Sequence, residues 1–196
     1  MDRGLFIVIE GIDGTGKSSQ VKRLGQWLAA QGRDVVLSRE PTDGPWGKKV
    51  RETAATGRLS PEDELSYFLN DRRQHVAELI EPSLAAGKVV ILDRYYFSTM
   101  AYQGARGFDP AEIRRQNEVF APVPDLLLIL DLDVDIALGR IGSRGDSANE
   151  FEKRGNLERC RAIFLTLRDE PFARVIDAGG SFDEVAADVR EALGSR

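Results

Sequence analysis

The sequence is poor in residues that build covalent or metal cross-links. A single cysteine, Cys160, and a single histidine, His75, occur among its 196 residues. One cysteine excludes an internal disulfide and a cysteine-rich zinc site. We interpret Cys160 as a core residue and His75 as a solvated or packed side chain rather than a catalytic one.

Long apolar runs and an excess of positive charge are also missing. No apolar run approaches the length of a membrane span. The formal net charge is −5, so the chain lacks the overall basic character of many nucleic-acid-binding proteins. We therefore expect neither a membrane nor a nucleic acid as partner. Because the chain enters a strand-like run almost at once, we expect no signal peptide and a cytoplasmic location.

Five short apolar runs alternate with helical patterns along the chain. Hydrophobic residues make up 42% of the chain and charged residues 30%, which is typical of a globular domain. The runs cover residues 5–9, 34–38, 88–92, 125–130 and 173–177. This alternation predicts an α/β, three-layer fold with a five-stranded parallel sheet, in one domain over residues 1–196.

The first apolar run is followed by Gly-Ile-Asp-Gly-Thr-Gly-Lys-Ser at residues 11–18, and a helical pattern begins near Lys17. The octapeptide fits the phosphate-binding loop G-x-x-x-x-G-K-[ST], and strand–loop–helix is the context that this motif requires. Its alternative is a chance glycine-rich turn, which this context disfavours. The predicted ATP-binding residues are Gly11, Ile12, Asp13, Gly14, Thr15, Gly16, Lys17, Ser18 and Ser19.

Polar side chains near this loop suggest how it would be used. Lys17 would reach the β- and γ-phosphates, and Ser18 would bind Mg²⁺. Asp93 follows the third apolar run, where a Walker-B-type acid could also hold the metal. For Glu10, at the end of the first run, a solvated carboxylate and a role in orienting the loop remain equally open.

Further side chains predict a second anion site. Arg94 follows Asp93 and could clamp a phosphate, although an ion pair between these neighbours is the alternative. Arg72 falls on the apolar stripe of a long helix pattern from about residue 60 to 86. A charge on such a stripe needs a partner, either an internal salt bridge or a polar ligand. Phe68, one turn away, could stack on a ring, with core packing as its alternative.

Two later segments complete the candidate site. The short helix predicted over 98–104 carries Thr99, Tyr102 and Gln103, which could contact a base or sugar. Residues 140–155 are basic and rich in glycine, which is typical of a lid over phosphates. The candidates there for a finger-like role are Arg140, Arg144 and Arg154, and a solvated loop is the alternative for each. Asp133 is interpreted as a helix cap, with a metal role as the weaker option.

Two facing phosphate sites describe a kinase that transfers a phosphoryl group to a small phosphorylated acceptor, mainly by positioning and charge neutralisation. At this point the chain resembles bacterial-type thymidylate kinases, of the P-loop nucleoside monophosphate kinase superfamily, over nearly its whole length. The matching segments are the loop at 11–18, Arg39-Glu40-Pro41, Phe68-Leu69-Asn70-Asp71-Arg72, Asp93-Arg94-Tyr95 through Ser98, and Ala101-Tyr102-Gln103-Gly104.

The resemblance implies transfer of the γ-phosphoryl group of ATP to dTMP, giving dTDP and ADP for dTTP biosynthesis, with Mg²⁺. It implies that Asp13 contacts the sugar 3′-hydroxyl and that Tyr102 crowds out a 2′-hydroxyl. Lys17, Arg94 and the lid arginines would serve the phosphates. The implied dTMP-binding residues are Asp13, Glu40, Pro41, Phe68, Arg72, Arg94, Ser98, Thr99, Tyr102 and Gln103. The family is homodimeric, which predicts a homodimer here.

Two positions depart from the family pattern. Some members carry an arginine just after the loop acid, where this chain has Gly14, so the lid would have to supply that charge. Many relatives place an arginine before the Phe-Glu pair of the lid, where this chain has Glu150. The identity of the acting lid arginine is therefore left open.

Two other functions compete with this interpretation. A kinase for another nucleoside monophosphate or for a deoxynucleoside is the closer one, and a deoxynucleoside would offer no phosphate to Arg94. A regulatory GTP-binding switch is the other. The sequence has no Asn-Lys-x-Asp motif for guanine, and its D-x-x-G match at 177–180 lies far from the loop in sequence.

Overall fold

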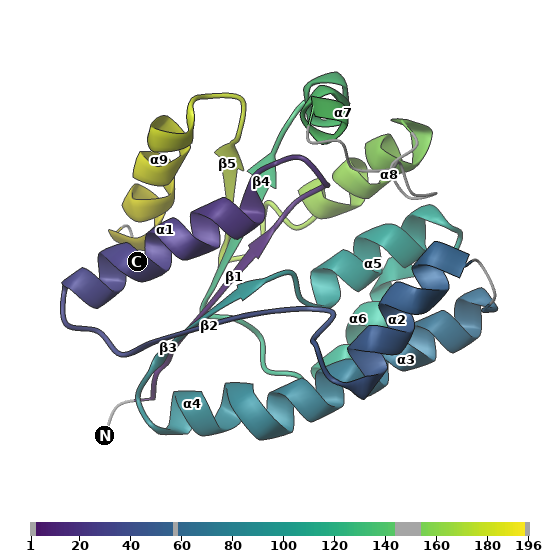
Figure 1. Ribbon diagram of the computed structural model, residues 1–196, viewed down its shortest axis with the longest axis horizontal. Helices are drawn as coiled ribbons and strands as arrows, with labels where there is room; N and C mark the ends of the chain where they lie inside the picture. The colour runs from purple at the N-terminus through teal and green to yellow at the C-terminus, as the bar shows by residue number, and fades with distance from the viewer. Residues whose placement is uncertain (1–2, 57–58, 144–153, 195–196) are drawn as a thin grey trace.

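The computed structural model describes residues 3–56, 59–143 and 154–194. Its centre is a parallel sheet of five strands in the order β2-β3-β1-β4-β5 (Figure 1). The strands are β1 (Leu5–Glu10), β2 (Val35–Arg39), β3 (Val89–Asp93), β4 (Leu126–Asp131) and β5 (Ala173–Asp177). Each lies within one residue of its predicted position, and the predicted α/β class with a parallel sheet is confirmed.

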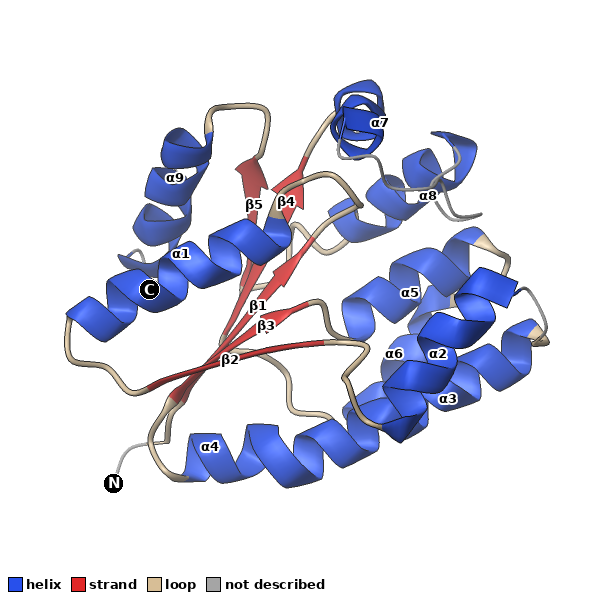
Figure 2. Cartoon of the chain, viewed as in Figure 1, coloured by secondary structure: helices blue, strands red, loops and turns tan. Residues whose placement is uncertain are grey.

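Helices cover both faces of this sheet, which explains why its central strands are apolar on both sides. Every residue of β3 is buried, and so is every residue of β4 but the last. Helices α1 (Lys17–Ala30) and α9 (Phe182–Gly194) pack together on one face (Figure 2). Helices α5 (Tyr96–Ala105) and α8 (Arg154–Leu165) pack together on the other, where Cys160 is buried as predicted.

One long helical stretch is interrupted before a proline. The sequence pattern predicts one helix from about residue 60 to 86. Instead α3 (Pro61–His75) passes into a π-helical turn, η1 (Val76–Ile80), before α4 (Glu81–Ala85). A proline lacks an N–H and its ring clashes with the carbonyl four residues earlier, so the irregularity appears in the turn ahead of Pro82.

The remaining helices begin at the expected signals. α3 is capped by Ser60, whose hydroxyl accepts from the Asp63 N–H. α6 (Pro110–Glu118) follows Asp109, and α7 (Val134–Ser143) follows Asp133, whose carboxylate accepts from the Asp135 N–H at 2.8 Å. The capping role of Asp133 is confirmed. α2 (Pro45–Thr56) begins at Pro45, because proline favours the first position of a helix.

The carboxyl ends of the parallel strands point to one edge of the sheet. The loop after β1, the Arg39–Pro41 segment after β2 and the Arg94 segment after β3 therefore meet there. Ligand sites of open α/β sheets form at this edge. Within the described ranges, none of the helices is both long and apolar enough to cross a bilayer.

Candidate active site

The loop over residues 11–18 has the backbone that phosphate binding needs. Gly11, Gly14 and Gly16 have φ angles of 140°, 88° and 89°, in the region that favours glycine. α1 starts at Lys17, so the positive end of the helix faces the hollow of the loop. The phosphate-loop interpretation therefore holds over a chance turn.

Gly14 also explains the first departure from the family pattern. A Cβ at this position would lie 2.6 Å from the carbonyl oxygen of Ala137 on α7. Contacts that short do not occur, and the φ angle of Gly14 would strain any other residue. A side chain such as arginine therefore does not fit here unless α7 moves.

Lys17, Ser18 and Asp93 lie together at the start of α1. The Lys17 Nζ donates to the Ile12 carbonyl at 2.8 Å, and the Ser18 hydroxyl donates to the Asp93 carboxylate. Burial lowers the pKa of Lys17 to about 8, with a further contribution from the nearby Arg94 and an opposing one from Asp13. An anionic ligand would favour the charged form of this ammonium.

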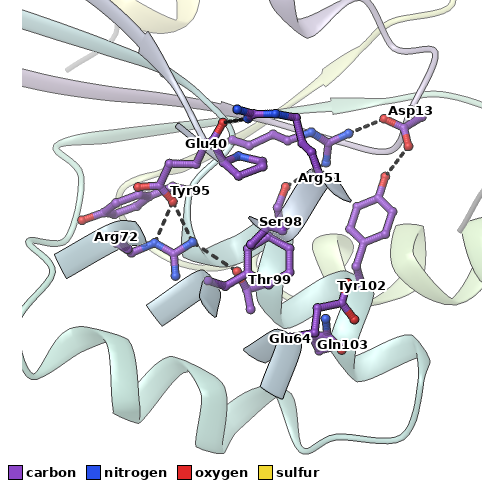
Figure 3. Close-up of a pocket in the computed structure, with 14 residues that line it drawn as sticks. Asp13, Glu40, Arg51, Glu64, Arg72, Tyr95, Ser98, Thr99, Tyr102 and Gln103 are labelled. Atoms are coloured by element: carbon purple, nitrogen blue, oxygen red, sulfur yellow. Dashed lines mark hydrogen bonds and ion pairs between the residues drawn. The ribbon is translucent and has the colours of Figure 1, made fainter. Parts of the chain in front are cut away.

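Arg94 ties the loop to α5. Its guanidinium pairs with the Asp13 carboxylate and donates to the Ser98 hydroxyl at 3.0 Å. The Tyr102 hydroxyl donates to the other oxygen of Asp13 at 3.1 Å (Figure 3). The expected alternative of an ion pair between Asp93 and Arg94 is thus replaced by a longer-range pair with Asp13.

Two pockets meet at this pair. One extends over the phosphate loop, from Gly14 to Ser19, and includes Asp93. The other lies between α2, α3 and α5 and includes Phe68, Arg72 and Gln103. The residues that line both are Asp13, Glu40, Pro41, Arg51 and Arg94. Such an arrangement lets two ligands approach each other end to end across Arg94.

Arg72 is nearly inaccessible, with 1% of its surface exposed, yet it lines the second pocket. Its Nε donates to the Glu40 carboxylate at 2.8 Å and its Nη2 to Thr99 at 3.1 Å (Figure 3). Its Nη1 donates to Asn117 at 2.6 Å. The internal salt bridge expected as one alternative for Arg72 is therefore present, and its contact with a polar ligand stays a prediction, although the side chain lines a pocket. His75 is buried and hydrogen-bonded to Glu40, as a packed histidine.

The second pocket combines an aromatic side chain, Phe68, with a buried amide group, Gln103, whose hydrogen-bonding atoms have no partner among the described residues. Phe68 is half-buried and lines this pocket rather than the central core. Gln103 has no exposed surface, and neither atom of its amide group has a hydrogen-bond partner in the structure. A buried polar group of this kind needs an explanation, and a ligand that both accepts and donates would supply one.

Several lining residues were missed by the sequence analysis. Arg51 on α2 lines both pockets, with its guanidinium donating to the Pro41 carbonyl and to Asp43. Glu64 is buried and pairs with Arg106. Glu64 lies four residues before Phe68 and eight before Arg72, so helical spacing could have found it. The sequence offered no comparable signal for Arg51, which lies on a helix without a motif.

Two of the candidate lid arginines, Arg140 and Arg154, stand apart from the two pockets. Arg140 donates to the Ala178 carbonyl at 3.1 Å, and Arg154 pairs with Asp135 and Glu158. Neither lines a pocket at the phosphate loop. Arg144 and Glu150 lie outside the described residues. The role of these arginines stays a prediction.

Together, the parallel sheet and the glycine-rich loop define a P-loop nucleotide-binding fold, and a second pocket adjoins the loop. Comparison with known proteins makes the class specific. The family described as Thymidylate kinase matches residues 9–189. A thymidylate kinase of Akkermansia muciniphila is 52% identical over 194 residues, which is 99% of this chain and 93% of that protein.

Two further relatives agree. Thymidylate kinases of Xanthomonas euvesicatoria and Xanthomonas campestris are 53% and 54% identical over 182 residues, which cover 93% of this chain and 80% and 79% of theirs. The chain belongs to the thymidylate kinase family. It is an ATP-using kinase that phosphorylates dTMP to dTDP.

Proposed function

We propose that transfer takes place where the two pockets meet, with ATP on the phosphate loop and dTMP between α2, α3 and α5. The observation that carries this proposal is the shared wall of the pockets, which includes Arg94 and Asp13. Both substrates are anions, and phosphoryl transfer needs little covalent chemistry from the protein. Positioning and charge neutralisation by Lys17 and Arg94 would supply most of the rate.

On the donor side, Lys17 would hold the β- and γ-phosphates and neutralise charge on the transferred group. Ser18 and Asp93 fit Mg²⁺ because they offer hydroxyl and carboxylate oxygens, which this ion prefers. Among the described residues there is no cluster of three or more His, Cys, Asp or Glu side chains that could hold a metal. This fits an ion bound by one or two protein oxygens with substrate phosphates and water. When bound, Mg²⁺ would neutralise phosphate charge.

On the acceptor side, Phe68 would stack on the base and Arg72 would donate to a base carbonyl oxygen. Gln103 and Thr99 would complete the hydrogen bonds to the ring edge. Cytosine would bring an amino group to the Arg72 guanidinium, where donor would face donor. This supports selection of thymine or uracil over cytosine by the hydrogen bonds that a wrong base leaves unmade.

The sugar would lie beside Asp13 and Tyr102. Their hydrogen bond of 3.1 Å closes the pocket next to the position expected for the ribose. Asp13 would accept from the 3′-hydroxyl, and the Tyr102 ring would leave no room for a 2′-hydroxyl. Arg94 would bind the acceptor phosphate, with Glu40, Pro41 and Ser98 shaping the surrounding wall.

The proposal extends to the lid and to the assembly. Residues 140–155 would close over the phosphates, with Arg140, Arg144 or Arg154 adding charge during transfer. The chain would act as one domain in a cytoplasmic homodimer, as its family membership suggests.

A panel of acceptors tests the proposal. The enzyme is incubated with ATP, Mg²⁺ and each of dTMP, dUMP, UMP, dCMP and thymidine, and the product is identified by mass. We expect dTMP to have the highest kcat/KM, dCMP and UMP to be poor acceptors, and thymidine to be inert. Phosphorylation of thymidine, or equal use of dUMP and UMP, would refute the assigned acceptor site.

Lys17→Ala should lower kcat by roughly 10²-fold or more while the protein stays folded.

A further inference from the structure

The carboxylate that ends β1 lies beneath the site without lining it. Glu10 has no exposed surface and belongs to neither pocket wall. The expectation of a solvated carboxylate is therefore wrong. Its hydrogen bonds lead away from the phosphate loop, toward the segment that follows β3.

Glu10 caps α5 from a distant part of the sequence. One carboxylate oxygen accepts from the Tyr95 N–H at 2.7 Å and from the Ser98 N–H at 3.0 Å. These are among the first N–H groups of α5, and the N-cap residue Tyr95 provides no side-chain hydrogen bond of its own. The negative charge also suits the positive end of the helix.

The second oxygen of Glu10 reaches Arg94 through one hydroxyl. The Ser98 Oγ donates to this oxygen at 2.6 Å and accepts from the Arg94 Nη1 at 3.0 Å. A hydroxyl has one proton, so donating it to Glu10 turns the lone pairs of Ser98 toward the guanidinium. Glu10 thereby fixes the direction of the bond that Ser98 makes with Arg94.

The backbone at Arg94 needs such support. Arg94 has a φ of 70°, and it is the only residue other than glycine with a positive φ in the described ranges. This conformation costs of order 1 kcal/mol or more in a residue with a Cβ, and it persists only when the surroundings determine it. The Arg94 N–H bonds to Ile9, one residue before Glu10, at 3.1 Å. The end of β1 thus holds Arg94 at both its backbone and its side chain.

We propose that Glu10 is a positioning residue for phosphoryl transfer, which holds Arg94 through Ser98 in the orientation that spans the two pockets. The proposal rests on the assigned role of Arg94 at the acceptor phosphate. Glu10 itself touches no substrate. Its loss would disturb the acceptor phosphate more than the ATP site, since Lys17 and the phosphate loop keep their own contacts.

The test compares Glu10→Gln, Ser98→Ala, the double variant and Arg94→Ala, with KM and kcat measured separately for dTMP and ATP. Glutamine keeps the shape of the side chain but presents an amide N–H₂ to the Ser98 hydroxyl, which reverses the bridge. We expect Glu10→Gln to lower kcat/KM for dTMP about 10- to 100-fold, as a misplaced binding group does, with the KM for ATP changed less than about twofold. Because both act through one bridge, the double variant should lose no more than the worse single variant.

Asp109→Asn is the matched control. Asp109 also caps a helix, α6, by accepting from the Ala111 N–H at 2.9 Å, but it is exposed and lies outside both pockets. The Asp109→Asn variant should leave the KM for dTMP and the KM for ATP unchanged. If Glu10→Gln fails to fold, Glu10→Asp keeps the charge and withdraws it by one methylene, and the same loss is expected.

The outcomes distinguish the positioning role of Glu10 from the role of Arg94 at the acceptor phosphate. A large effect of Arg94→Ala with wild-type kinetics in Glu10→Gln would overturn the positioning role alone. Wild-type use of dTMP by Arg94→Ala would overturn the role of Arg94, and with it the purpose of Glu10. Equal losses for ATP and dTMP, additive with Ser98→Ala and accompanied by a lower melting temperature, would show that Glu10 is merely structural.

Discussion

At the residue scale, the site depends on charges that are buried and paired. Glu40 accepts from Arg72 and is hydrogen-bonded to His75, whose other ring nitrogen lies 2.8 Å from the Ser38 hydroxyl. Burying a carboxylate without partners is costly, so each member of this network depends on the others. The network fixes the guanidinium in the acceptor pocket before a substrate arrives.

Arg72→Ala should harm both stability and base choice. Removing the guanidinium leaves Glu40 buried beside His75 alone, so the free energy of unfolding should fall by about 3 kcal/mol. The KM for dTMP should rise, and the preference over dCMP should shrink. Denaturant unfolding and steady-state kinetics measure these changes. Arg73→Ala is the control, because Arg73 is an exposed neighbour that only lies over the Phe120 ring. Equal effects of the two substitutions would contradict the account.

The ionisation of Glu10 gives a pH signature. Burial raises the pKa of Glu10 to about 7, although Arg94 and the hydrogen bonds from Ser98 and Tyr95 oppose the shift. A carboxyl with a raised pKa keeps its proton in the folded state while the unfolded state has lost it. This one group therefore lowers stability as the pH rises from about 4.5 to 7.

Glu10→Gln should remove that dependence. The difference in melting temperature between variant and wild type should grow in favour of the variant from pH 4.5 to 7 and then level off. Melting curves of both proteins at matched ionic strength measure it. A constant difference over this range would show that the Glu10 carboxyl titrates normally. A variant that is more stable yet less active would mean that the charge is retained for positioning, at a cost in stability.

Single-residue predictions from the sequence succeeded where a pattern constrained them. Helical spacing placed Arg72 and Phe68 on one face, and the structure brings both to one pocket. The position of Arg51 in the pocket wall was not predicted from the sequence, because it depends on how α2 packs against the Pro41 loop, which is a tertiary contact. The capping function of Glu10 was not predicted for the same reason, since the backbone groups that it caps are 85 and 88 residues away in the sequence.

At the scale of elements, α3 and α5 contribute many of the residues that line the pocket proposed for the acceptor. They are tied at the pocket edge by the ion pair between Glu64 on α3 and Arg106, the residue after α5. Glu64 is buried, so this pair differs from the many exposed pairs of the surface. We expect this pair to help set the spacing of the two helices, and so the width of the pocket.

Arg106→Ala should loosen this wall. We expect a loss of about 2–3 kcal/mol in unfolding free energy, because the buried Glu64 carboxylate loses its cation. The KM for dTMP should rise with little change in that for ATP. Arg115→Ala provides the comparison, since the Arg115–Glu112 pair on α6 is exposed and worth at most about 1 kcal/mol. Similar losses in both variants would mean that the Glu64 pair carries no special weight.

The positions of strands and helices were predicted from local sequence signals. Where the structure differs from a prediction, the cause is also local. The central strands β3 and β4 were predicted to within a residue because they are buried on both faces, which gives a continuous apolar run in the sequence. The π-helical turn before Pro82 was not foreseen, since a proline can also be accommodated by a kink.

At the scale of the whole molecule, the parallel sheet gathers three strand ends into one crevice. The order β2-β3-β1-β4-β5 places the ends of β2, β3 and β1 side by side, and with them Glu40, Arg94 and Asp13. This convergence followed from the alternating pattern of the sequence together with the general geometry of such sheets. The pairing of Arg94 with Asp13 needed the structure.

Assembly is predicted at the same scale. Val119, just after α6, is 82% exposed, and Phe120 beside it faces Arg73 of α3. We expect the homodimer to form through α3 and α6. Sedimentation velocity at micromolar concentration should then show twice the mass of the chain. Val119→Lys should shift the population toward the monomer, because a charge would be placed against an apolar partner surface. A monomer at all concentrations would refute the dimer.

The proposed function requires one crevice to bind both anionic substrates and to align them across Arg94. A crystal structure of the enzyme with dTMP and a non-hydrolysable ATP analogue tests this alignment. We predict the Arg94 guanidinium on the dTMP phosphate, Phe68 against the thymine ring, and the analogue's terminal phosphate on the loop beside Lys17. A dTMP molecule bound elsewhere, or Arg94 turned away from its phosphate, would contradict the account.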